Sequence, residues 1–164
     1  MEQTLDCNYY KTLEVCHAFL PLLKPTGRIV NVASVVGKLD KYSDEVRDRF
    51  VNSRSEEDVT RIMHDFYVQV EAGKEKEAGF PSAAYAVSKA GLIGGTRALA
   101  RVEKEKGSAV LINSCCPGYV NTDMTKGKGT KTPDEGAQTP VMLALADIKG
   151  KTGAFWQSEK EISW

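Results

Sequence analysis

Apolar residues recur along this chain at two different spacings. Between residues 4 and 23 they stand three or four positions apart, which predicts an amphipathic helix that Pro25 and Gly27 end. Three other apolar runs are short, are bounded by turn residues and glycine, and are typical of buried strands. These runs cover residues 28–33, 109–114 and 153–157.

The residues between the first two strands are rich in charge. Over residues 38–79 the pattern predicts two helices, one near 43–51 and one that begins at the capping box formed by Ser55 and Asp58. The second helix carries its apolar residues on one face. We therefore expect a helical insertion between the two strands.

A long helix is predicted over residues 82–106, and another over 132–146. Glycines at 91, 94 and 95 of the long helix each cost about 1 kcal/mol relative to alanine, so we expect another element to pack closely against them. The alternation of helices and strands predicts an α/β fold with a parallel sheet, whose ligands bind beyond the C-terminal ends of the strands. Ser34 and the pair Pro117-Gly118 stand at two such ends.

Composition narrows the class of protein. Lys and Arg number 22, as do Asp and Glu, so net charge gives no reason to expect nucleic acid or an anionic membrane as a partner. No apolar run is long enough to span a membrane, and the first 15 residues lack the pattern of a signal peptide. The spacing of the four cysteines suggests neither a metal site nor a disulfide framework. We therefore expect reduced thiols, no metal, a cytoplasmic location and a small-molecule ligand.

Tyr85 and Lys89 stand four residues apart at the start of the long helix, a spacing that places both side chains on one helical face. Alone, this spacing fits a phenol tuned by an ammonium group or an ordinary pair of helix residues. The glycine- and lysine-rich stretch at 127–131 lacks the spacing of a phosphate-binding loop. It is interpreted as a lid beside the site or as a solvated loop.

Four motifs in order resemble the second half of a short-chain dehydrogenase/reductase: NYYKT, NVAS, YAVSK and CCPGYVNTDM. The separation of 51 positions between Ser34 and Tyr85 is similar to that of the monomeric carbonyl reductases, which carry a helical insertion there. The resemblance extends over essentially all 164 residues. It implies a Rossmann-like doubly wound sheet, truncated at the N-terminus, within a single partial catalytic domain (1–164).

The resemblance implies a catalytic tetrad of Tyr85, Ser34, Lys89 and Asn8. Reduction of a carbonyl group requires a proton for its oxygen, and Tyr85 would supply it as the general acid. A free phenol titrates near 10, so a neighbouring lysine cation would bring its pKa closer to neutrality. Ser34 would orient the substrate carbonyl, Lys89 would also hold the cofactor ribose, and Asn8 would continue a proton relay.

The same resemblance implies NADPH as cofactor and aldehydes, ketones or quinones as substrates. Val35 and Tyr119 would join Ser34 in lining the substrate pocket. The cofactor would contact Tyr85 and Lys89 together with residues of one segment: Pro117, Gly118, Val120, Asn121 and Thr122.

One departure from the family pattern concerns the nucleotide. The family binds the pyrophosphate at a glycine-rich turn, T-G-x-x-x-G-x-G, which these 164 residues do not contain. We expect the first strand to lack its usual neighbour, so the family's monomeric state could give way to self-association. Two hypotheses follow: a carbonyl reductase given as a partial chain, or a truncated, non-catalytic relative that acts through protein association.

Overall fold

The computed structural model describes residues 1–164 and begins with one continuous helical segment. This segment comprises α1 (Glu2–Leu5), a π-helical turn η1 (Asp6–Tyr10), α2 (Lys11–Phe19) and a 3-10 turn η2 (Leu20–Leu22). The helix predicted over 4–23 is therefore confirmed, but its regular geometry is interrupted at η1. Because a π turn adds only one residue to the helix, apolar spacings of three and four do not reveal it.

The strands form one sheet in the order β1-β2-β3-β4. The parallel strands β1 (Arg28–Val32), β2 (Leu111–Cys116) and β3 (Phe155–Gln157) confirm the three predicted strands. The fourth strand, β4 (Lys160–Ile162), pairs antiparallel with β3 and was not predicted. Its turn residues Ser158 and Glu159 have φ of 49° and 58°, so this hairpin lacks the glycine or asparagine that usually marks such a turn.

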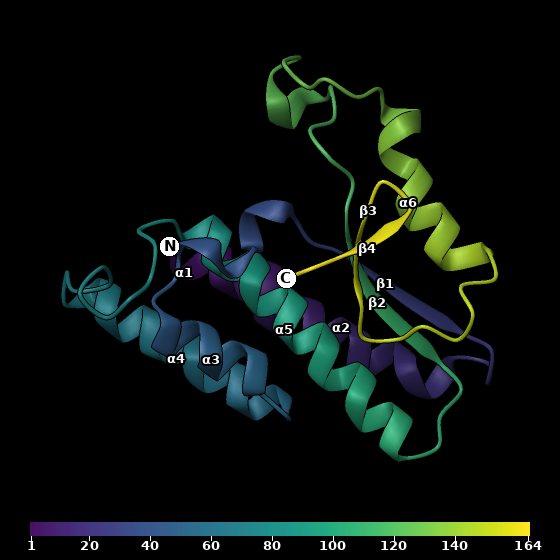
Figure 1. Ribbon diagram of the computed structural model, residues 1–164, viewed down its shortest axis with the longest axis horizontal. Helices are drawn as coiled ribbons and strands as arrows, with labels where there is room; N and C mark the ends of the chain where they lie inside the picture. The colour runs from purple at the N-terminus through teal and green to yellow at the C-terminus, as the bar shows by residue number, and fades with distance from the viewer.

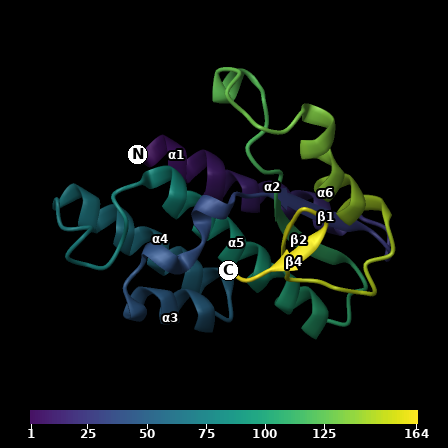
Figure 2. The same cartoon turned by 45° about the horizontal axis from the view of Figure 1, so that its top comes forward.

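Helices cover both faces of the sheet (Figures 1 and 2). On one face, α5 (Ala84–Glu105) and α2 pack on β2 through a buried cluster that includes Cys16, Leu99 and Ile112. On the other face, α6 (Pro133–Leu145) packs through Leu143 against Cys115. This layered arrangement confirms the predicted α/β class. No helix combines the length and the apolar character needed to cross a membrane.

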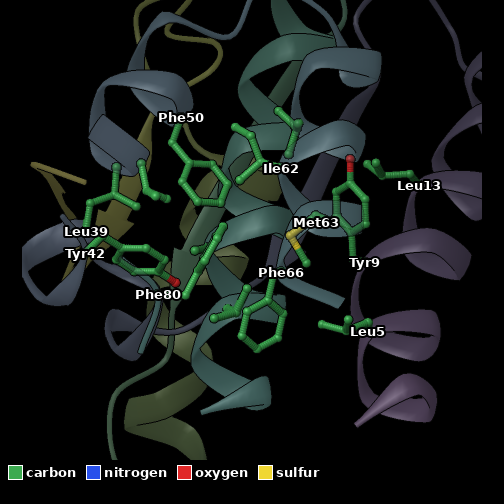
Figure 3. Close-up of a cluster of buried hydrophobic side chains, with 14 residues drawn as sticks. Leu5, Tyr9, Leu13, Leu39, Tyr42, Phe50, Ile62, Met63, Phe66 and Phe80 are labelled. Carbon is green, nitrogen blue, oxygen red and sulfur yellow. The ribbon is translucent and has the colours of Figure 1, made fainter. Parts of the chain in front are cut away.

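The charged insertion forms the predicted pair of helices, α3 (Asp44–Asn52) and α4 (Glu56–Glu71). They pack on α5 and on the first helical segment around 14 buried residues, ten of which are labelled in Figure 3. The expected close packing at the α5 glycines is confirmed. A Cβ at Gly91 would lie 2.5 Å from Sδ of Met63, and one at Gly95 would lie 2.9 Å from Cδ1 of Leu13.

Candidate active site

A cavity of about 420 Å³ opens at the C-terminal ends of β1 and β2. Ser34 reaches it just after β1, and Pro117 and Gly118 reach it just after β2. Tyr85 and Lys89 reach it from the first turns of α5. Its wall contains 15 residues: Val32, Ala33, Ser34, Tyr85, Lys89, Cys116, Pro117, Gly118, Val120, Thr122, Met124, Thr125, Pro133, Gly136 and Ala137. Three members of the expected tetrad thus share one cavity.

Lys89 lies against the face of Tyr85. Its Nζ atom is 5.7 Å from the centre of the Tyr85 ring and donates a hydrogen bond of 2.9 Å to the carbonyl oxygen of Val32. This bond ties the start of α5 to the end of β1. The helical spacing of four residues therefore brings the two side chains together, and the backbone of the neighbouring strand fixes the ammonium group.

The titration of both groups is governed first by burial. Partial burial raises the pKa of the Tyr85 phenol above its ordinary value, while the interaction with Ser34 acts in the opposite direction. Burial lowers the pKa of Lys89. Lys89 is not among the groups that shift the pKa of Tyr85 in this arrangement, so the lowering by Lys89 that the sequence led us to expect stays a prediction.

Ser34 is an extended residue with φ of −161° that caps a short 3-10 turn, η3 (Val35–Gly37). Its Oγ accepts a hydrogen bond of 3.3 Å from the Val36 N–H. Beyond it, η3 lies so close to α5 that a Cβ at Gly37 would be 2.7 Å from both the Ala90 nitrogen and the Lys89 carbonyl carbon. This contact of two backbones sets the distance between Ser34 and the helix that carries Tyr85.

Substituting Gly37 by alanine should destabilise the protein by about 1 to 3 kcal/mol, because the new methyl group would overlap the backbone of α5. Chemical denaturation measures this loss. Val36→Ala is the matched control in the same turn: the Val36 side chain is 47% exposed, so its loss should change stability by no more than about 0.5 kcal/mol. Equal stability of Gly37→Ala and the wild-type chain would contradict the close contact.

Asn8 does not line the cavity. It lies in the π turn η1, and its Nδ2 donates a hydrogen bond of 3.0 Å to Oγ of Ser88. Ser88 is fully buried and donates in turn to the carbonyl oxygen of Tyr85 at 2.8 Å. Asn8 is thus connected to the backbone of Tyr85 through Ser88, a residue to which sequence reasoning assigned no role although it lies within the motif YAVSK.

The other expected site residues divide into two groups. Pro117, Gly118, Val120 and Thr122 line the cavity, whereas Val35, Tyr119 and Asn121 are not part of its wall. Val35 packs beside Ala33 and Leu92, the Tyr119 side chain is 52% exposed, and Asn121 borders a separate polar hollow. Cys116, Met124 and Gly136 line the cavity without having been predicted, because nothing in their spacing distinguishes a wall residue from a buried one.

Comparison with known proteins supports the resemblance found in the sequence. Residues 67–133 match the family model described as short chain dehydrogenase. Carbonyl reductase (NADPH) 1 of Mus musculus and its Homo sapiens counterpart are each 41% identical over 99% of this chain and 61% of their own length. The structure of salutaridine reductase from Papaver somniferum superposes with a TM-score of 0.85, at 31% identity, over 95% of this chain and 54% of that protein.

These matches support a short-chain dehydrogenase of the carbonyl reductase type. The chain spans about three fifths of the length of the curated carbonyl reductases that it matches. The family match includes Tyr85, Lys89 and the segment from Pro117 to Thr122. The helical insertion α3–α4 lies between Ser34 and Tyr85, as predicted.

Proposed function

We propose that residues 1–164 form the catalytic part of an NADPH-dependent carbonyl reductase, within one partial Rossmann-like domain. Its reaction would convert aldehydes, ketones or quinones into alcohols. The observation that carries this proposal is the single cavity lined by Ser34, Tyr85 and Lys89. The names of the matched relatives support the choice of carbonyl reduction and of NADPH. We include a cytoplasmic location in the proposal, which is supported by four free cysteines.

The wall of the cavity fits the nicotinamide end of NADPH. Gly118 has φ of 90°, a backbone conformation that favours glycine, and with Pro117 it forms part of the cavity wall that the nicotinamide ring would contact. Lys89 would bind ribose hydroxyls, while Val120 and Thr122, which line the same cavity, would offer the cofactor an apolar and a hydroxyl surface. When bound, NADPH would supply the hydride for the carbonyl carbon.

Tyr85 would give its proton to the carbonyl oxygen. Its raised pKa keeps the phenol protonated at neutral pH, so it enters the reaction as an acid. Ser34 interacts with the same phenol, and a substrate oxygen bound between the two hydroxyls would be oriented by both. Asn8 and Ser88 would act as positioning residues, because they hold the backbone of Tyr85 and do not reach the cavity.

The test uses residues 1–164 fused behind the nucleotide-binding half of mouse carbonyl reductase (NADPH) 1, hereafter the joined protein. Oxidation of NADPH in the presence of a quinone or an aldehyde, followed by absorbance, is the readout. We expect turnover that depends on Tyr85. A well-folded joined protein that binds NADPH but reduces none of these compounds would contradict the proposal.

A second candidate function is association with another protein chain through β1. This strand stands at one end of the sheet and pairs only with β2, and its last residue, Val32, is 48% exposed. Unpaired N–H and C=O groups at such an edge can form hydrogen bonds with a strand of another chain. The observation favours self-association of the 164 residues when they are expressed alone.

The edge of β1 gives a measurable expectation. Light scattering coupled to size-exclusion chromatography should show that the mass of the 164-residue chain rises with protein concentration. Val32→Lys should shift the protein toward monomer, because a charged side chain at an edge opposes strand pairing. A constant monomer mass up to high concentration would exclude association through this edge.

A further inference from the structure

Lys131 is held in a fixed backbone position beside the candidate active site. It forms an isolated parallel bridge with Val120, a residue of the cavity wall. Its N–H donates to the carbonyl oxygen of Tyr119 at 3.0 Å, and its own carbonyl accepts from the Asn121 N–H at 2.8 Å. The backbone of Lys131 therefore follows the segment that leaves β2, although Lys131 comes 10 positions after Asn121 in the sequence.

The side chain of Lys131 extends over Gly118. A Cβ at Gly118 would lie 3.0, 3.1 and 3.3 Å from Cδ, Cε and Nζ of Lys131. The absent side chain of Gly118 thus leaves room for the end of Lys131.

Although its charge adds to the hydrogen bonds from Thr132 that lower the pKa of the Glu135 carboxyl group, the ammonium group of Lys131 forms no direct ion pair. None of the ion pairs in the structure includes it, and its polar contact is with Oγ of Ser158 at 3.5 Å. The nearby Glu135 carboxylate is engaged by the N–H and hydroxyl of Thr132 at 2.7 and 3.1 Å. That capping box also provides hydrogen-bond partners for free backbone N–H groups at the N-terminus of α6, which therefore offers no anion site of its own.

We propose that Lys131 binds an anionic oxygen, from a carboxylate or a phosphate, of a ligand that lies over Gly118. Lys131 itself borders the polar hollow beside Asn121, whereas Gly118 belongs to the wall of the candidate active site. This inference therefore rests on the proposed function, because the ligand would lie in that cavity. A half-buried cation without a direct ion pair gains most from a charged acceptor, since charge-assisted hydrogen bonds are about twice as strong as neutral ones. The anion would be a group on the carbonyl substrate or a phosphate of the cofactor.

A matched pair of small aldehydes tests the substrate as the source of the anion. 4-Carboxybenzaldehyde carries a carboxylate, and methyl 4-formylbenzoate is its neutral counterpart. NMR titration of the 164-residue chain gives both dissociation constants without catalysis. Lys131→Gln should weaken binding of the carboxylate about 10-fold, or about 1.4 kcal/mol, and leave the ester unchanged. Lys131→Arg should restore binding, while Lys126→Gln, which removes an exposed charge from the same loop, should have no effect.

The joined protein tests whether the anionic oxygen that Lys131 binds comes from the cofactor. A Lys131→Gln variant whose KM for NADPH rises about 10-fold with every substrate would assign the anion to a cofactor phosphate. Unchanged binding of both aldehydes and an unchanged KM for NADPH would overturn the proposal, as would equal weakening of the carboxylate and the ester. If the joined protein reduces no aldehyde, the proposed function fails, but the NMR titration still decides the role of Lys131.

Discussion

Replacing Tyr85 by phenylalanine in the joined protein should reduce the turnover of NADPH with a quinone or aldehyde by about 100- to 10,000-fold. The substitution removes one oxygen atom and with it the only phenol in the wall of the cavity. Without this hydroxyl the developing alkoxide loses the acid that would protonate it, so the loss should appear in kcat. The ring of Tyr85 stays, and with it the contact with Lys89.

Tyr67→Phe is the matched control for this experiment. Tyr67 lies in α4, packs against the cluster of Figure 3 and takes no part in the cavity. Its loss of a hydroxyl should leave turnover unchanged. Comparable thermal unfolding of both variants would show that the fold is intact. Turnover of Tyr85→Phe within a few-fold of wild type would show that another group supplies the proton.

The parts of the fold that the sequence predicted are those with long or strongly patterned elements. The helices α4 and α5 extend over several turns, and α4 begins at a capping box that is formed in the structure. The strands β1 and β2 are apolar runs between turn residues, and they pair from Arg28 opposite Leu111 to Val32 opposite Cys115. In each case local pattern and long-range packing favour the same structure.

The features that sequence reasoning missed depend on contacts between distant residues. The β3–β4 hairpin turns at Ser158 and Glu159, two residues that do not signal a turn with positive φ. The role of Asn8 in the π turn depends on its hydrogen bond with Ser88, 80 positions away in the sequence, which the local pattern does not reveal. The close approach of Gly37 to α5 is held on its other side by Trp164, whose Nε1 donates to the Gly37 carbonyl at 3.0 Å.

The candidate site also combines features that follow from local sequence with features that depend on contacts between distant residues. A spacing of four residues in a helix brings the side chains of Tyr85 and Lys89 together independently of the other elements. The local sequence was therefore enough to predict that these two side chains are neighbours. The pKa of Tyr85 could not be predicted in this way, because its largest cause is burial by surrounding elements. Lys131 likewise had no role in the sequence analysis, since its contact with Gly118 arises only when the loop returns to Val120.

Expressed alone, residues 1–164 should bind NADPH about a hundredfold to a millionfold more weakly than a complete carbonyl reductase. The cavity can contact the nicotinamide end, but the sequence has no T-G-x-x-x-G-x-G turn to receive the pyrophosphate. Charge-assisted hydrogen bonds contribute about 1.5 to 3 kcal/mol each. Losing two or three of them costs about 3 to 9 kcal/mol, and each 1.4 kcal/mol corresponds to about a tenfold change in affinity.

Calorimetric titration of the 164-residue chain and of the joined protein with NADPH measures this difference directly. We expect a dissociation constant in the micromolar range or below for the joined protein, and no saturable binding at such concentrations for the chain alone. Turnover should follow the same order, because a well-placed Tyr85 cannot act on a substrate while the hydride donor is absent. Micromolar binding and measurable reduction by the chain alone would mean that the contacts of the cavity wall, including those at Lys89 and Gly118, suffice to hold the cofactor.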